Sequence, residues 1–333
     1  MFYRSLFTLL CLSTTAIFSD FYTVYAHGII DGPQQMNRFI EAIATDAAHN
    51  TALTFPDTIK ETKYDINRLA SEVSTSLGKP FNRSNMYMGQ NQDIQTVHQT
   101  VQSHSHDQLI LYGCSRGAAA IIGEVSTHNP TNVAAIVLDA APANMPATLH
   151  GKLALLGIHL SYDTTVFSTI FPAYPYNSIT PFDAIKNIKN KNLPILLLHS
   201  ENDLLVSFDH ALKLYKEFKK EGFNNVYFAR IKDGRHSFML KDKYGNNAPD
   251  TCRKPYLQAV HSFYKKHNLP YNPEYALDDM TPYEHNLDQI NYEIQKCIHK
   301  LQQQYTYSVK RNTVAVILTT AAILLYAYRK ASS

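Results

Sequence analysis

The chain has 333 residues, of which 45% are hydrophobic and 18% are charged, a balance typical of a globular protein and not of a disordered chain. This length allows one large domain or two small ones. The formal net charge of +3 is spread along the sequence without a long basic block, which excludes nucleic acid as an obvious partner.

The N-terminal segment has the layout of an export signal. Arg4 precedes an apolar run from Leu6 to Phe18, and small residues follow. The run is too short for a comfortable membrane span. We therefore expect residues 1–19 to be a signal peptide, with a buried, uncleaved helix as the alternative.

Apolar, β-rich runs then alternate with helical patterns. Strands are expected over residues 21–28, 51–55, 109–113, 133–139, 194–200 and 226–231. Helices are expected over residues 33–48, 93–103 and 118–125. Each strand is a nearly continuous apolar run, as in parallel strands that are buried on both faces. The alternation therefore predicts an α/β sheet wrapped by helices.

Residues 140–193 break this rhythm, because they are rich in Pro, Tyr and His and are too long for a simple crossover. They predict an inserted cap over one end of the sheet. A Pro- and Tyr-rich linker covers residues 268–281. Beyond it, apolar side chains recur at three- and four-residue steps, at Ile290, Ile294, Cys297, Leu301 and Tyr305. This stripe predicts an amphipathic helix that either packs on the domain or forms a stalk.

The C-terminal segment 312–328 carries no charge and is followed by Arg329 and Lys330. Its length is at the lower limit for crossing a bilayer, and basic residues just beyond a span favour a cytoplasmic end. A buried terminal helix normally has a polar face, and this segment has none. We expect a transmembrane helix over 312–328 with a short basic tail, 329–333.

The sequence GCSRG places Ser115 between Gly113 and Gly117, directly after a predicted strand and before a small-residue helix. A sharp turn of this kind is a nucleophile elbow, which pushes the serine hydroxyl beyond the strand end. Glycines are needed beside it because side chains there would collide with the neighbouring strand or helix. The helix N-terminus adds partial positive charge beside a developing oxyanion. A purely structural turn is the alternative.

A serine hydroxyl is a poor nucleophile without a base, so the elbow predicts an acid and then a histidine downstream. Asp203 lies in the loop after the strand 194–200, and His236 lies in the loop after the strand 226–231. Loops at the carboxyl ends of parallel strands share one edge with Ser115. Asp203 would fix the imidazole tautomer and stabilise the imidazolium. Asp139, at the end of the strand 133–139, is an alternative acid.

With its segments GCSRG, HSENDLLV and DGRHSF in this order, the chain resembles the α/β-hydrolase superfamily over residues 21–267, and its later part is most similar to serine peptidases and monoacylglycerol lipases. His27-Gly28 matches the early His-Gly signature of that superfamily. The resemblance implies an oxyanion hole made by the backbone N–H groups of Ile29 and Arg116. The signal leaves almost no room for the usual N-terminal hairpin. We therefore expect a mostly parallel, doubly wound sheet of about six strands with a helical cap.

Three further sets of residues leave their roles open. The side chain of Arg116 faces an anionic substrate group or covers the helix end. Cysteines outside the signal number three, none with zinc-site spacing, and a Cys252–Cys297 disulfide is one option in an exported chain. Residues 104–107, His-Ser-His-Asp, suggest metal spacing but lie in a polar loop without further ligands. We expect no metal and no organic cofactor.

Together these features predict an exported, membrane-tethered serine hydrolase with a catalytic domain over 20–267 and a linker and helix over 268–311. Ser115 would attack an ester or amide carbonyl of a small-molecule or peptide substrate and form an acyl-enzyme, which water activated by His236 would hydrolyse. An acyltransferase with the same triad and a non-catalytic binding protein on the same scaffold are the alternatives. The sequence leaves the oligomeric state open.

Overall fold

A computed structural model describes residues 21–28, 33–45, 49–55, 89–148, 179–242, 245–279, 288–300 and 302–303. The expected signal peptide, the expected transmembrane helix and Ile29 lie outside these residues. Within the described ranges, no helix has both the length and the apolar character that a membrane crossing needs.

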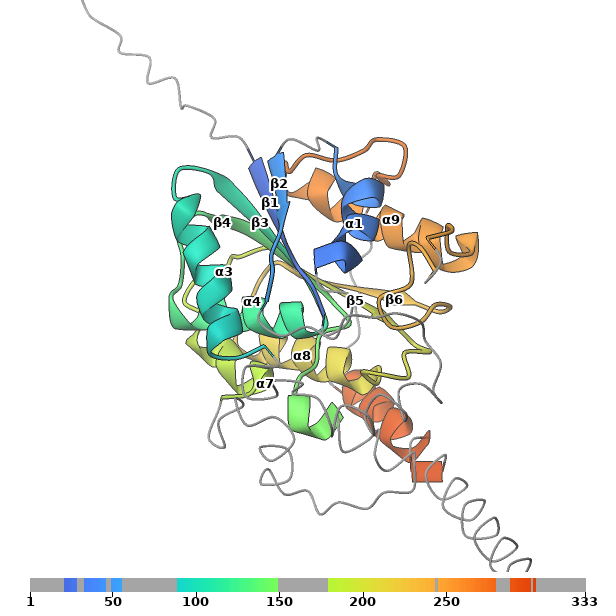
Figure 1. Cartoon of the computed structure of the whole chain (residues 1–333). Helices are drawn as coiled ribbons and strands as arrows, with labels where there is room; N and C mark the ends of the chain where they lie inside the picture. The colour runs from blue at the N-terminus through green and yellow to red at the C-terminus, as the bar shows by residue number, and fades with distance from the viewer. Residues whose placement is uncertain are drawn as a thin grey trace, which may run out of the picture.

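Six strands form one sheet in the described part of the chain (Figure 1): β1 Phe21–Ala26, β2 Asn50–Ala52, β3 Gln108–Cys114, β4 Val133–Asp139, β5 Ile195–Ser200 and β6 Val226–Ile231. Their order is β2-β1-β3-β4-β5-β6, and every neighbouring pair is parallel. The chain therefore winds outward from β1 in one direction and then in the other, which confirms the predicted doubly wound sheet. Strand β2 is shorter than the predicted 51–55.

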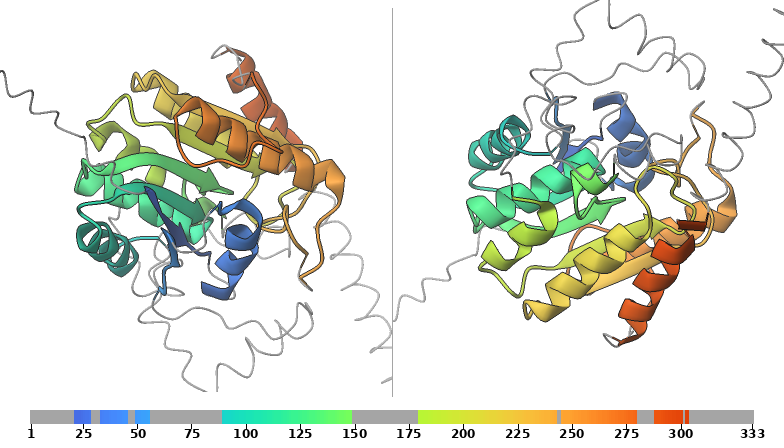
Figure 2. Two further views of the ribbon diagram at one scale, coloured as in Figure 1. Left: turned by 90° about the horizontal axis from the view of Figure 1, so that it is seen from above. Right: turned by 90° about the horizontal axis from the view of Figure 1, so that it is seen from below.

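Helices cover both faces of this sheet (Figure 2). One face carries α1 Pro33–Ile43 and α9 Asp250–Lys266, and the other carries α3 Gln92–Ser103, α4 Arg116–Thr127, α7 Pro181–Ala184 and α8 Asp209–Lys220. In α1, for example, Met36, Phe39 and Ile43 are buried at helical spacing against the sheet. The helix ends at Ile43, earlier than the predicted residue 48.

The continuous apolar runs are explained by burial on both sides of the sheet. Along β3, Leu109 and Leu111 enter the core beneath α3 and α4, whereas Ile110 and Tyr112 enter the core beneath α1 and α9. Successive strand residues point to opposite faces, so a strand covered on both sides needs apolar residues at every position. Each such side chain contributes roughly 1.5–3 kcal/mol on burial.

Both described ends of the predicted cap pack into the domain. Ala143 lies in the core at the beginning of this segment, and Ala184, Ile185 and Leu193 lie in it near the end. These ends therefore belong to the domain itself. The remainder of the predicted cap, 149–178, lies outside the described residues.

The three cysteines outside the predicted signal are free thiols. Cys252 lies in α9 against one face of the sheet, and Cys297 packs against the core on the opposite face. A Cys252–Cys297 disulfide is therefore wrong, because the sheet separates the two sulfur atoms.

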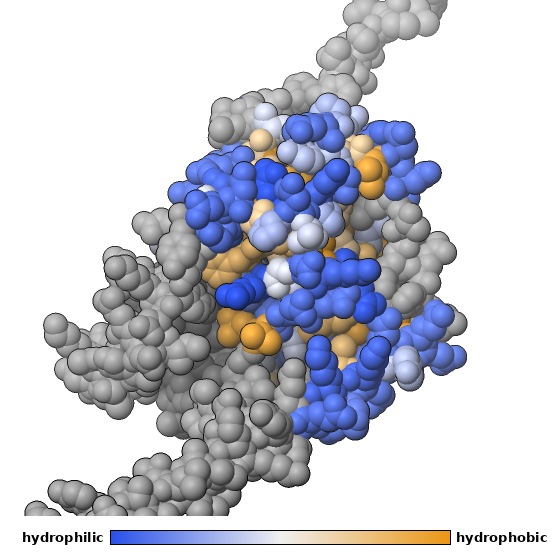
Figure 3. Space-filling view, turned by 90° about the vertical axis from the view of Figure 1, so that its right-hand side faces the viewer, coloured by the Kyte–Doolittle hydropathy of each residue, from blue (hydrophilic) through white to orange (hydrophobic). Residues whose placement is uncertain are grey.

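One face of the described domain is mostly polar. On the face seen from the right of Figure 1, hydrophilic residues predominate and hydrophobic areas between them are small (Figure 3). Apolar side chains are thus used mainly inside the two cores, as expected for a globular domain.

The helical segment 288–300 packs on the domain. Ile290 and Ile294 are buried in the same core as α8, and Lys216 of α8 donates a hydrogen bond to Asn291 (2.6 Å). The apolar stripe therefore faces the domain over these residues, which selects packing over a stalk.

We predict that Ile290→Ala lowers the free energy of unfolding by about 2–4 kcal/mol, because it removes a fully buried side chain and leaves a cavity. Tyr292→Ala, on the exposed side of the same segment, is the matched control and should change it by less than about 0.5 kcal/mol. Urea denaturation followed by circular dichroism measures both. Equal effects of the two substitutions would contradict packing on the domain.

Candidate active site

Ser115 occupies a strained turn between β3 and α4. Its backbone has φ 52° and ψ −113°, a left-handed conformation that non-glycine residues rarely adopt. A Cβ atom on Gly117 would lie 2.0 Å from the backbone oxygen of Ala26, and one on Gly113 would lie 2.6 Å from Cα of Ala118. Both positions therefore require glycine, for the steric reason that the sequence suggested.

Asp203 and His236 form a hydrogen-bonded pair in the loops that follow β5 and β6. Nδ1 of His236 donates to Oδ2 of Asp203 at 2.7 Å. The other oxygen, Oδ1, accepts from the backbone N–H groups of Leu205 (2.7 Å) and Val206 (2.9 Å). The carboxylate is thus held on both sides and orients the imidazole ring.

Asp203 is an anion in this setting. Burial by itself raises the pKa of its carboxyl group, but the charge of His236 and the hydrogen bond from it outweigh burial and lower the pKa to about 2. His199 is fully buried near this carboxylate. Its Nε2 donates to the backbone oxygen of Val206 (2.8 Å). The carboxylate therefore has the charge that a partner of His236 needs.

Contacts between neighbouring residues bring the elbow and the histidine loop together. Cys114 and Ser237, which adjoin Ser115 and His236 in sequence, share a buried hydrogen bond (Sγ to Oγ, 2.7 Å). Because β3, β5 and β6 are parallel, the residues that follow them lie at one edge of the sheet. The structure thus brings the serine, acid and histidine positions to the same edge of the sheet.

The acid loop and the histidine loop are also tied to each other. Ser200 donates from Oγ to the backbone oxygen of Gly234 (2.9 Å), and Asn202 donates from Nδ2 to that of Lys232 (2.9 Å). These bonds fix the distance between the ends of β5 and β6. They hold the Asp203 side chain within reach of His236.

The His27-Gly28 segment lies beside the elbow. A Cβ atom on Gly28 would lie 3.5 Å from Cβ of Ser115, and the N–H of Gly28 donates to Oε1 of Gln35 (2.7 Å). Burial lowers the pKa of His27 to about 4, so the ring is neutral: Nδ1 donates to the oxygen of Gly28 and Nε2 accepts from the N–H of Phe55. The segment is therefore built to hold its backbone against Ser115.

The side chain of Arg116 is fully buried and is not open to solvent beside the elbow. Its Nε and one terminal nitrogen each donate to Asp93 at 2.6 Å. The same carboxylate accepts from the N–H of Gly89 (2.6 Å), and the ring of Phe55 lies 5.1 Å from the guanidinium carbon. This ion pair fixes the first turn of α4. No local pattern predicts this ion pair, because Arg116 and Asp93 are 23 residues apart in the chain.

Asp139 has a different environment from Asp203. Its Oδ2 accepts from the hydroxyl of Tyr256 (2.9 Å), which is in turn hydrogen-bonded to Tyr112. Burial raises the pKa of Asp139 to about 7, in spite of the opposing hydrogen bond from Tyr256. Of the two candidate acids, Asp203 is the one that bonds to His236.

The His104–Asp107 loop has a structural explanation. Nδ1 of His104 donates to Asp107 at 2.8 Å, and its ring stacks on Tyr22 with 3.9 Å between centroids. Among the described residues, these side chains are not part of a group with three potential metal ligands.

A comparison with known families matches residues 74–253, more than half of the chain, to the prolyl oligopeptidase family. The chain belongs to the prolyl oligopeptidase family. The matched range contains Ser115, Asp203 and His236. Membership makes the protein a serine hydrolase of the α/β-hydrolase superfamily, as the sequence predicted.

Solved structures with a similar fold include other hydrolases. An esterase from Pyrococcus furiosus is 18% identical, with 74% of this chain and 82% of that chain covered and a TM-score of 0.47. An acylaminoacyl peptidase from Pyrococcus horikoshii is 14% identical, with a TM-score of 0.48; 82% of this chain matches 40% of that enzyme. A monoacylglycerol lipase from Paleococcus ferrophilus is 15% identical, with 67% and 89% covered and a TM-score of 0.42. No curated protein sequence matches this member of the prolyl oligopeptidase family.

The two acids give opposite pH dependences of stability. Because the folded pKa of Asp139 is raised, an unfolded chain releases this proton near pH 4 while the folded chain keeps it until about pH 7. The wild type thus loses stability as the pH rises through that window, by about 1.4 kcal/mol per pKa unit. Asp139→Asn should lack this loss and be more stable than the wild type at pH 8.

Asp203→Asn is the matched control. Its lowered folded pKa contributes stability that is fully present above about pH 4 and is lost as the pH falls through about 2, so this variant should be the less stable one at neutral pH. Urea denaturation from pH 3 to 8 measures both variants. A similar loss of stability in both at pH 8 would contradict the different environments of the two carboxyl groups.

Proposed function

We propose that this protein hydrolyses ester or amide bonds through Ser115, His236 and Asp203. The observation that carries the proposal is the hydrogen bond from Nδ1 of His236 to Asp203, at the edge of the sheet where Ser115 sits on its strained turn. Membership of a peptidase family supports an amide substrate. Similarity in fold to esterases agrees with an ester substrate. Both substrates pass through the same tetrahedral intermediate.

In the first step His236 acts as the general base. Because Asp203 accepts from Nδ1–H, the other ring nitrogen, Nε2, is left with its lone pair and removes the proton of the Ser115 hydroxyl. The serine oxygen attacks the carbonyl carbon, and the leaving group takes the proton back from Nε2. Water then repeats the sequence on the acyl-enzyme, and His236 is again the base.

The developing oxyanion needs two N–H donors. Arg116 is the first residue of α4, so its N–H is at the positive end of the helix dipole and next to the nucleophile. Ile29, which follows the Gly28 backbone beside Ser115, supplies the second donor by analogy with the superfamily. One donor of this kind is typically worth a factor of about 10² to 10³ in kcat.

Cys114 is not an alternative nucleophile. Its side chain is fully buried, and burial raises the pKa of the thiol well above its usual range. A protonated, buried thiol is unreactive. Its role is structural, because its hydrogen bond to Ser237 joins the elbow to the loop that carries His236.

We predict that a fluorophosphonate labels one residue, Ser115, stoichiometrically, because the general base activates its hydroxyl and the oxyanion donors stabilise the tetrahedral adduct. Ser115→Ala and His236→Ala should abolish labelling. Ser126→Ala, a buried serine on the same helix, should leave it unchanged. Mass spectrometry of the tryptic digest identifies the site.

Turnover of ester substrates tests whether the residues act as a unit. Ser115→Ala should lower kcat by several orders of magnitude, roughly 10⁴ or more, and adding His236→Ala should lower it little further. An adduct on another residue, additive losses in the double variant, or no labelling of the folded protein would contradict the proposal.

We also propose that the protein is exported and held to a membrane by the segment 312–328. The uncharged run followed by Arg329 and Lys330 supports this proposal. Because the segment 288–300 is docked on the domain, the twelve residues from 300 to 312 allow a reach of at most about 40 Å from it. The active site would then work close to the membrane surface.

In cells, the full chain should stay with the membrane fraction during alkaline carbonate extraction, because a spanning helix is not removed by high pH. A chain that ends at Arg311 should be soluble and should still react with the fluorophosphonate. Immunoblots of the two fractions measure the outcome. Release of the full chain by carbonate would overturn the membrane proposal without affecting the catalytic one.

A further inference from the structure

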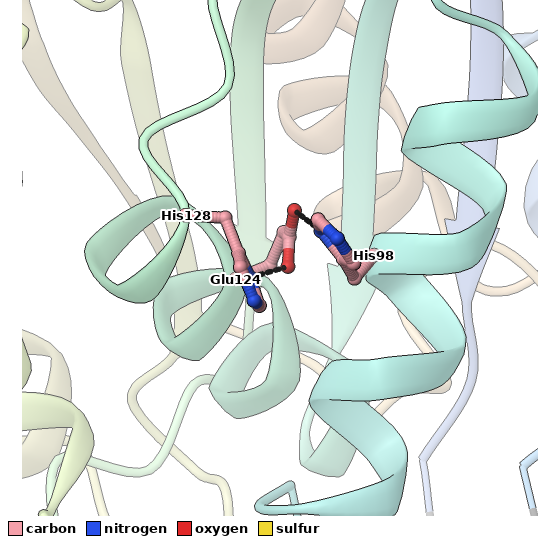
Figure 4. Close-up of side chains that lie close together, drawn as sticks. All are labelled: His98, Glu124 and His128. Carbon is pink, nitrogen blue, oxygen red and sulfur yellow. Dashed lines mark hydrogen bonds and ion pairs between the residues drawn. The ribbon is translucent and has the colours of Figure 1, made fainter.

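A cluster of two histidines and one glutamate joins α3 to α4 away from the candidate active site. His98 extends from α3, Glu124 from α4, and His128 from the C-cap of α4, four residues after Glu124 (Figure 4). Nδ1 of His98 donates to one carboxylate oxygen (3.0 Å) and Nδ1 of His128 donates to the other (2.6 Å). Nine residues of helix, about 13 Å, separate Glu124 from Ser115.

The carboxylate of Glu124 is held between the two imidazoles, with one ring nitrogen at each oxygen. Its side chain is completely buried, and among the described residues the two imidazoles are its only ionisable hydrogen-bond partners. A buried carboxylate is costly unless it is paired with a cation or binds a metal. A metal ion held by the same three side chains would meet this requirement.

The donor set fits a particular class of cation. The three ligand atoms, one from each side chain, all lie within 4.8 Å of one another. Two imidazole nitrogens and a carboxylate oxygen suit zinc and other first-row divalent metals, whereas magnesium and calcium prefer oxygen ligands alone. Two atoms that both bind one tetrahedral zinc ion at 2.0–2.1 Å lie roughly 3.3 Å apart. Nδ1 of His98 lies at 3.0 Å from its Glu124 oxygen, near this value, and Nδ1 of His128 would move outward from 2.6 Å.

The two rings face each other, and they are partly open to solvent. Their centroids are 3.7 Å apart, with 23° between the ring planes, so a shared ion requires the rings to turn their Nδ1 atoms toward each other. The side chains of His98 and His128 are 22% and 31% exposed. An ion can therefore enter from solvent, and water can fill its remaining coordination positions.

We propose that His98, Glu124 and His128 bind one divalent first-row transition metal ion, such as Zn²⁺. Its role is structural, because it links α3 to α4. Arg116 and Asp93 already join the first turns of the same two helices. The metal ion would fix a second point farther along them and hold α4 against movement beneath the elbow.

Zinc titration of the purified, untagged full-length chain tests the proposal. Isothermal titration calorimetry should show one Zn²⁺ bound per chain at this site, with an affinity at least tenfold weaker in His98→Ala and in Glu124→Gln. Glu124→Gln keeps the size and the hydrogen-bonding capacity of the side chain, so it should stay folded. Zn²⁺ should raise the melting temperature of the wild type by more than that of either variant.

His104→Ala is the matched control, because it removes a histidine that bonds to a single aspartate at similar exposure. It should bind Zn²⁺ as the wild type does. Co²⁺ should give a visible absorption band with the wild type and the control, and lose it in Glu124→Gln. Equal binding by the wild type and Glu124→Gln, or no saturable binding at all by the folded wild type, would overturn the proposal.

Discussion

The close approach of helix α4 to strand β1 at Gly117 is the constraint on which the candidate site depends. A single added carbon at this position would lie 2.0 Å from the oxygen of Ala26. This contact brings the helix N-terminus against the ends of the central strands, and the chain has to turn sharply at Ser115 to connect the two. The strain at the serine is therefore a consequence of packing that the two cores stabilise from both sides of the sheet.

The ionisable groups around this turn show how a protein interior holds charge. The guanidinium of Arg116 is buried but has the Asp93 carboxylate as its partner. The carboxylate of Asp203 is buried but has His236 and two backbone donors. Among the residues that the structure describes, Asp139 has no cationic partner in hydrogen-bond contact, and burial raises its pKa so that it keeps its proton more readily. Each group is either paired or neutral, as the low dielectric of the interior requires.

Local patterns were sufficient to predict most of the sheet. Strands β3, β4, β5 and β6 are buried on both faces and therefore need an apolar residue at almost every position. Such continuous apolar runs can be recognised in the sequence itself. Boundaries were less well predicted where composition changes gradually, as in the short strand β2 and at the end of α1. The periodicity of the stripe that contains Ile290 did not show what the stripe faces, since a helix packed on the domain and a helix that forms a stalk can have the same spacing.

The sequence by itself determined the elbow at Ser115 and the need for glycine on either side of it, because both depend on neighbours within a few residues. It also predicted Asp203 and His236 as the acid and the histidine, from their places in the loops after two predicted strands. Only the tertiary structure decided that His236 bonds to Asp203 and not to Asp139, that Arg116 turns inward to Asp93, and that Cys252 and Cys297 lie on opposite faces. It also brought His98 to Glu124. These pairs form where separate helices and strands pack against one another. Local periodicity shows which face of an element is buried, but it does not show which other element covers that face.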